Sequence, residues 1–219
     1  MDKEKILKRL EARKLIAVVR MRSSDDEVLK TCEALVAAGI EAVEITADVP
    51  GARELVAALA GIAGDRHLVG AGTVMDLDTA SSMIAAGAQF IVTPVVIPEV
   101  IEAAVGAGVA VFPGALTPSE IWSAHRMGAD AVKVFPASLV GPSYLRELSG
   151  PLPGLRLIPT GGINLENVAR FIRAGAFAVG VGSALIDRQA AAEGDWEKVA
   201  AKAARFVREV EGAQERDDK

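Results

Sequence analysis

The sequence predicts an α/β fold, a (β/α)8 TIM barrel with an extra N-terminal helix. The first observation is a recurring glycine: positions 39, 87, 108, 128 and 175 each lie between a helical pattern and a short apolar run. Glycine suits the C-terminus of a helix because it adopts positive φ without strain. The second is that these runs are apolar rather than alternating, as in strands buried on both faces of a parallel sheet.

The third observation is the spacing of the repeats. The intervals from Gly87 to Gly108 and from Gly108 to Gly128 each have the length of one strand and one helix, and the other intervals are about twice as long. Each long interval therefore contains a further unit. The expected strands are 15–20, 42–46, 68–72, 90–93, 110–113, 131–135, 155–160 and 177–181.

An open doubly wound sheet is the alternative architecture. The barrel is favoured because the repeats run evenly to the end of the chain. The segments between strands carry periodic apolar residues typical of helices, and Ser24 with Glu27 is typical of a capping box. Residues 2–13 are expected to form the extra helix, and the charged segment 212–219 is expected to be a disordered tail. Because no linker interrupts the pattern, residues 1–219 are predicted to form a single domain.

The composition indicates a cytoplasmic protein without a metal or other cofactor. The chain has 219 residues, 51% of them hydrophobic, and a formal net charge of −5 with both signs mixed along it. Mixed charge argues against nucleic-acid binding. No apolar stretch reaches the ~20 residues that span a bilayer, and the charged N-terminus argues against a secretory signal. One cysteine permits no internal disulfide, and two distant histidines do not have the spacing of a zinc site.

Lys133 is the residue that points most directly to chemistry. It stands in the apolar run 131–135, where an ammonium without a partner is strongly unfavourable. A buried amine can avoid that penalty by losing its proton, and a neutral amine is a nucleophile toward a carbonyl carbon. Glu44 stands in a similar run, 42–46. The two residues predict Schiff-base chemistry. The alternative, a structural ion pair between them, is less favoured because such pairs add little stability.

Other polar and glycine residues collect at the C-terminal ends of the expected strands, where barrels of this kind place their active sites. Two glycine-rich loops, 161–162 and 180–183, follow the last two expected strands. Backbone N–H groups in such loops and at the start of a helix bind anions, so the loops predict a phosphate site. The alternatives are glycines that only turn the chain and an Arg20 that is only an exposed charge at a strand end.

Six phrases in their order along the chain resemble the 2-keto-3-deoxy-6-phosphogluconate (KDPG) aldolase family. The resemblance extends from about residue 5 to residue 211. Single phrases of this kind are common among barrels, whereas the ordered combination is specific. The phrases are residues 16–20 (IAVVR), 43–46 (VEIT), 69–73 (VGAGT), 133–137 (KVFPA), 159–162 (PTGG) and 181–184 (VGSA).

The resemblance implies a class I aldolase, a lyase of carbohydrate metabolism that reversibly cleaves KDPG to pyruvate and glyceraldehyde 3-phosphate. It implies a Schiff base on Lys133, proton transfer by Glu44, and a homotrimer. Arg20, Thr73 and Thr160 would hold the pyruvate end, and the glycine-rich loops would hold the phosphate. The implied substrate-binding residues are Arg20, Thr73, Pro94, Phe135, Thr160, Gly161, Gly162, Gly182 and Ser183.

Asp48 departs from the family pattern. Some members carry a basic residue at this position, two places after Thr46, and an aspartate there would repel an anionic substrate unless it points away. The sequence therefore leaves three candidate substrates: KDPG, its galactonate epimer and 4-hydroxy-2-oxoglutarate. Two other functions are alternatives to the aldolase. One is a sugar-phosphate isomerase or epimerase, with Glu44 and Lys133 as proton shuttles. The other is a non-catalytic barrel used as an engineered assembly scaffold.

Overall fold

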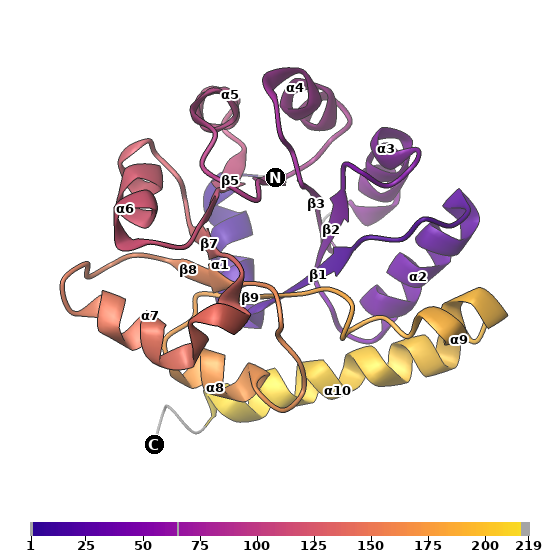
Figure 1. Cartoon of the computed structure of the whole chain (residues 1–219). Helices are drawn as coiled ribbons and strands as arrows, with labels where there is room; N and C mark the ends of the chain where they lie inside the picture. Colours follow the sequence, from indigo (N-terminus) through magenta and orange to yellow (C-terminus); the bar gives the residue numbers. More distant parts are fainter. Residues whose placement is uncertain (1, 65, 216–219) are drawn as a thin grey trace.

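The computed structural model describes residues 2–64 and 66–215. Its strands form a curled parallel sheet around a common centre, and most of the helices lie outside it (Figure 1). The expected strand positions are confirmed, and the boundaries at 42–46 and 68–72 agree fully. The strands are β1 (Leu15–Val19), β2 (Ala42–Thr46), β3 (Leu68–Gly72), β4 (Phe90–Val92), β5 (Ala110–Phe112), β6 (Gly114–Ala115), β7 (Val132–Val134), β8 (Leu157–Pro159) and β9 (Val179–Val181).

Hydrogen bonding divides the strands into two parallel sheets. The larger has the order β5-β4-β3-β2-β1-β9, and the smaller has the order β6-β7-β8. The expected strand at 110–113 continues as β6, with Pro113 between the two segments. Proline has no N–H to donate to a neighbouring strand, which explains the interruption. At the other side, an isolated parallel bridge joins Thr160 to Gly180.

The helices begin and end where local signals place them. All five recurring glycines have positive φ, between 68° and 99°. Ser24 accepts a hydrogen bond from the Glu27 amide at 3.3 Å. The helices are α1 (Lys3–Arg13), α2 (Asp25–Ala37), α3 (Ala52–Ala63), α4 (Leu77–Ala85), α5 (Pro98–Gly106), α6 (Pro118–Arg126), α7 (Gly141–Ser149), α8 (Val168–Arg173), α9 (Arg188–Glu193) and α10 (Trp196–Gln214), with a short 3-10 helix η1 (Ala137–Leu139).

The two ends of the chain differ in how they match expectation. The predicted extra helix is α1, which starts at Lys3. Helix α10 continues to Gln214, so residues 212–214 of the expected tail are helical, and residues 216–219 lie outside the described part of the chain. No helix within residues 2–64 and 66–215 has both the length and the apolar character required to cross a bilayer.

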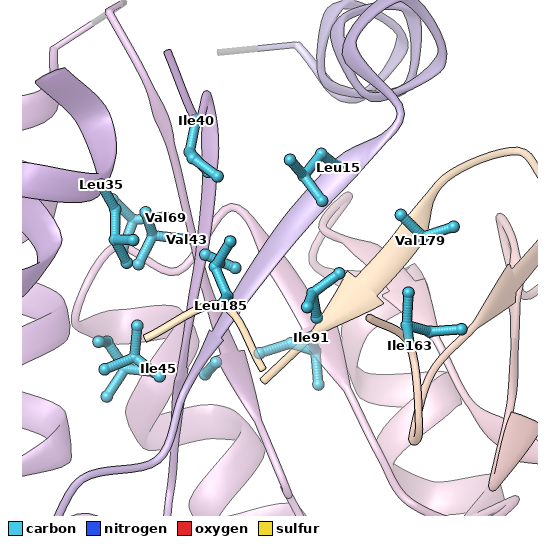
Figure 2. Close-up of a cluster of buried hydrophobic side chains, with 14 of the residues drawn as sticks. Leu15, Leu35, Ile40, Val43, Ile45, Val69, Ile91, Ile163, Val179 and Leu185 are labelled. Atoms are coloured by element: carbon cyan, nitrogen blue, oxygen red, sulfur yellow. The ribbon is translucent and has the colours of Figure 1, made fainter. Parts of the chain in front are cut away.

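Two apolar clusters lie on opposite faces of the strands. The outer one fills the space between strands and helices, and Val43, Ile45 and Val179 belong to it (Figure 2). The inner one lies on the concave side of the curled sheet and contains Phe90 and Phe112, whose ring centroids are 5.6 Å apart. Helix α1 adds Ile6, Leu7 and Leu10 to this inner cluster. The space inside the curled sheet is therefore apolar at the end where the strands begin.

Gly70→Ala is expected to destabilise the fold. A Cβ at Gly70 would lie 2.2 Å from the Phe90 ring, so the inner cluster would have to shift, at about 1–3 kcal/mol. Gly61→Ala in α3 is the matched control, because nothing lies within 4 Å of its Cβ and alanine favours helix, giving about 0.5–1 kcal/mol of stabilisation. Urea unfolding midpoints measure both. Equal midpoints for the two variants would contradict the inner packing described above.

Candidate active site

Strand alternation decides which side chains point to the concave side of the curled sheet. Val43 and Ile45 in β2, and Val132 and Val134 in β7, belong to the outer cluster. Successive side chains on a strand point to opposite faces, so Glu44 and Lys133 point inward. The register supports this placement, since Val18 pairs with Glu44, and Lys133 pairs with Ile158 of the inner cluster.

A pocket of about 390 Å³ opens at the ends of the strands, and Lys133 lines it. It also contains every substrate-binding residue expected from the sequence: Arg20, Thr73, Pro94, Phe135, Thr160, Gly161, Gly162, Gly182 and Ser183. Further residues complete the lining: Val18, Ile163, Asn164, Gly180, Ala184, Ile186 and Arg188. Gly180 belongs to the glycine-rich loop expected from the sequence, and Val18 and Ala184 lie within the six phrases, whereas Asn164 and Arg188 follow the strand ends at distances that no motif marks.

Lys133 is buried, with 6% of its surface exposed. Its Nζ lies 5.3 Å from the centroid of the Phe135 ring, which is within the range of a cation–π contact. The same ring packs over Gly161, where a Cβ would lie 3.2 Å from it. Because the backbone amide of Lys133 donates to the Pro113 carbonyl at 2.8 Å, β7 is held beside the chain segment that connects β5 and β6.

Glu44 lies deeper than Lys133 and is 2% exposed. Its Oε1 has no hydrogen-bond partner among the described residues. The carboxylate occupies space that Gly72 leaves free, since a Cβ there would lie 1.8 Å from Oε1. Burial raises the pKa of Glu44 above its ordinary value, while the positive charges of Lys133 and Arg20 act in the opposite direction.

Glu44 and Lys133 are neighbours without being an ion pair. The salt bridges within the described residues do not include one between them. Both line an internal cavity of about 10 Å³ together with Thr160 and Gly180, close to the smallest volume that holds one water molecule. The structural ion pair considered from the sequence is therefore absent, and the buried carboxyl group stays available for proton transfer.

Arg20 is held at the mouth of the pocket by two contacts. Its Nη2 donates to Thr73 Oγ1 at 2.5 Å, and its Nε lies 3.4 Å from Asp48 Oδ1. Thr73 has a φ of 55°, a left-handed conformation that is unusual for a β-branched residue and typical of functional sites. Asp48 is not among the residues that line the pocket, so its carboxylate pairs with Arg20 instead of facing a bound anion.

The two glycine-rich loops both line the pocket, and the parallel bridge between Thr160 and Gly180 brings them next to each other. Gly161 and Gly162 have φ values of 89° and 80°, a conformation that a larger residue would adopt only with strain. A Cβ on Gly162 would lie 2.6 Å from Ser138, and one on Gly180 would lie 2.3 Å from Thr160 Oγ1. Glycine therefore allows the close backbone approach that forms this wall.

The charges on the pocket lining all have one sign. Arg20, Lys133 and Arg188 line it, and no acidic side chain does so among the described residues. The chain as a whole has a net charge of −5. The described residues also contain no group of three or more histidine, cysteine, aspartate or glutamate side chains placed to hold a metal ion. The pocket can therefore attract an anion and present a buried lysine to it, and Glu44 lies beside that lysine in the small internal cavity.

Curated relatives carry the names of aldolases. The chain is 38% identical over 195 residues to 2-dehydro-3-deoxy-6-phosphogalactonate aldolase of Escherichia coli K12, covering 89% of this chain and 93% of the relative. It is 36% identical over 197 residues to 2-dehydro-3-deoxy-phosphogluconate aldolase of Treponema pallidum, covering 90% of this chain and 93% of the relative.

Solved structures show the same resemblance. A native KDPGal structure matches with a TM-score of 0.85 and 37% identity, over 92% of this chain and 96% of the other. The KDPG aldolase of Legionella pneumophila, with pyruvate captured as a covalent carbinolamine, has a TM-score of 0.84 and 28% identity, over 94% and 98%. A cube-shaped cage designed by fusing symmetric oligomeric domains has a TM-score of 0.86 and 37% identity, over 94% and 74%.

The match to a family model spans most of the described structure. The model of KDPG and KHG aldolase covers residues 6–202, from α1 into α10, and this range includes Lys133, Glu44 and the pocket lining. With relatives at 36–38% identity over nearly the whole chain, this protein belongs to the KDPG and KHG aldolase family.

Proposed function

We propose that the protein is a class I aldolase that reversibly cleaves KDPG to pyruvate and glyceraldehyde 3-phosphate. The observation that carries the proposal is the buried lysine at the base of a cationic pocket, with a carboxyl group of raised pKa beside it. The covalent pyruvate adduct of the Legionella relative supports the Schiff-base chemistry.

The first half of the reaction forms the covalent intermediate. After its ammonium group gives a proton to the Glu44 carboxylate, the neutral amine of Lys133 attacks the C2 carbonyl carbon, and proton transfer from nitrogen to oxygen gives a carbinolamine. Glu44 donates a proton to the carbinolamine hydroxyl, which leaves as water and produces the iminium. Burial raises the pKa of Glu44, so its carboxyl group retains a proton more readily than an exposed glutamate and can act as this acid.

The second half breaks the carbon–carbon bond. The Glu44 carboxylate removes the proton of the C4 hydroxyl, the C3–C4 bond breaks, and its electron pair enters the iminium, which becomes an enamine. Glyceraldehyde 3-phosphate leaves. Protonation of the enamine at C3 and attack of water on the resulting iminium release pyruvate and restore the amine of Lys133. One group must therefore both give and take a proton, which favours a carboxyl group with a raised pKa.

The remaining pocket residues divide between the two ends of the substrate. Arg20, Thr73 and Thr160 hold the pyruvate end, where a guanidinium can bind a carboxylate, and Pro94 and Phe135 shape the wall. Gly161, Gly162, Gly182 and Ser183 hold the phosphate. Support for this division comes from the parallel bridge between Thr160 and Gly180, which brings the two glycine-rich loops next to each other in the pocket lining.

The proposal extends to the architecture of the whole protein. Residues 1–219 form one domain, a closed eight-stranded barrel in which β5 and β6 count as one strand and the Thr160–Gly180 bridge joins the two sheets. The protein is a cytoplasmic homotrimer. The exposed apolar side chains of Val95 and Leu139 support a subunit interface, and the cage related to this chain was built from symmetric oligomeric domains.

Lys133→Ala is expected to lower kcat for KDPG cleavage by roughly 10⁴-fold or more, because the nucleophile is removed. Borohydride reduction with pyruvate should label Lys133 in the unchanged protein, as peptide mass analysis would show, and should label nothing in the variant. Lys30→Ala, which removes an exposed lysine of α2, is the control, and its Lys133 should be labelled as in the unchanged protein. Absence of a pyruvyl adduct in the unchanged protein would instead favour an isomerase or epimerase.

Glu44→Gln is expected to lower kcat by about 10²–10⁴-fold, since the amide can neither give nor take the proton. Because burial raises the pKa of Glu44, the carboxylate is lost at a higher pH than for an exposed glutamate. The rate should therefore fall, as the pH decreases, through an apparent pKa above that of a free glutamate. The pH profile of kcat measures this limb. An unchanged profile in the variant would assign the limb to another group, and Glu54→Gln on α3 is the control.

Substrate choice is tested by comparing kcat/KM for KDPG, its galactonate epimer and 4-hydroxy-2-oxoglutarate, using coupled pyruvate release. The phosphorylated gluconate is expected to react fastest. A faster galactonate epimer would assign the chain to the activity named for the Escherichia coli relative. Release of no pyruvate from any of the three, from a large closed particle in solution, would favour the scaffold.

A further inference from the structure

The pocket contains one cation that the proposed mechanism does not use. Of its three positively charged residues, Lys133 is buried and serves as the nucleophile. Arg20 already contacts Thr73 and Asp48, so part of its charge is neutralised by the aspartate. The third cation is Arg188, the first residue of α9.

The guanidinium of Arg188 is positioned without being neutralised. Its Nη2 donates to the backbone carbonyl of Arg20 at 3.3 Å, and the salt bridges within the described residues do not include Arg188. A guanidinium has five N–H donors, and this contact uses only one nitrogen. The other donors and the full positive charge therefore remain available at the mouth of the pocket.

The backbone of Arg188 is held firmly beside the glycine-rich wall. Asp187 caps α9 by accepting a hydrogen bond from the Ala190 amide at 3.0 Å. Ile186 and Ala190 are buried in the outer cluster on either side of Arg188. The same loop begins at Gly182 and Ser183, which line the pocket. The loop thus joins the glycine-rich backbone at Gly182 and Ser183 to Arg188, whose guanidinium lines the same pocket and extends to the Arg20 carbonyl.

We propose that Arg188 binds the terminal phosphate of the substrate and determines the preference for phosphorylated over unphosphorylated substrates. The inference rests on the proposed function. Some family members carry a basic residue at the position of Asp48, which in this chain pairs with Arg20. Arg188 supplies a positive charge for the phosphate from a different position. A guanidinium recognises phosphate through parallel N–H···O bonds, which an ammonium cannot reproduce fully.

Arg188→Ala is expected to lower kcat/KM for KDPG by about 10- to 100-fold, the range of one charge-assisted contact. The loss should appear mainly in KM. The same variant should change kcat/KM for unphosphorylated 2-keto-3-deoxygluconate by less than about threefold, since that substrate lacks the phosphate that the contact requires. Arg188→Lys should fall between the unchanged protein and Arg188→Ala on KDPG.

Two further variants separate charge from structure. Arg188→Gln keeps a polar side chain with N–H donors at this position but removes the charge, so it should behave like Arg188→Ala on KDPG. Arg173→Ala removes an exposed arginine at the end of α8 that does not line the pocket, and it should leave both substrates unaffected. Thermal unfolding should show all variants to be folded. Raising the ionic strength should reduce the phosphate preference of the unchanged protein more than that of Arg188→Ala.

The outcomes distinguish failure of this inference from failure of the proposed function. The inference would be overturned if Arg188→Ala lowered kcat/KM equally for both substrates, or if Arg188→Gln kept the KDPG kinetics of the unchanged protein. Either result would show that Arg188 only supports Arg20. An unchanged preference in Arg188→Ala would also overturn it while pyruvate trapping on Lys133 persists. If the unchanged protein traps no pyruvate, the aldolase proposal itself fails.

Discussion

The burial of two ionisable side chains on the inner face of the strands is the constraint on which the site depends. Glu44 and Lys133 are almost fully buried, and no ion pair joins them. An unpaired buried polar group opposes folding, so the surrounding core must stabilise it. The two apolar clusters supply that stability from opposite faces of each strand. The raised pKa of Glu44 is the chemical consequence of this arrangement.

The interior changes character along the strands. Where the strands begin, α1 and the aromatic pair of Phe90 and Phe112 fill it with apolar side chains. Where they end, glycines leave room for functional groups: Gly72 for the Glu44 carboxylate and Gly180 for Thr160. Glycine removes volume without adding a polar group, so the site gains space while the backbone ladder is preserved.

Electrostatics separates the pocket from the rest of the surface. The chain is acidic overall, yet the charged residues of the pocket lining are all cations. Such a cavity concentrates anions by focusing the field. Asp48 lies outside the pocket lining and pairs with Arg20. This contact keeps the Arg20 guanidinium near Thr73. Of the two arginines that line the pocket, Arg188 is the one without a salt bridge among the described residues.

The strands, the glycine-terminated helices and most of the pocket residues could be predicted from the sequence, because they depend on local signals. A glycine that ends a helix and the apolar run that follows it identify one unit, and the repeat of such units then places Lys133 and Glu44 within strands. Arg188 and Asn164 could not be found this way, since no spacing marks them.

By itself, the sequence determined the order of the strands and the types of residue at their ends. Only the tertiary structure decided that Glu44 and Lys133 lie together without pairing, that Asp48 turns to Arg20, and that Arg188 reaches the pocket. These outcomes depend on the directions of side chains, and on the distances between them, when they come from elements far apart in the chain. The packing of the parallel strands sets these directions and distances, and the local sequence pattern does not.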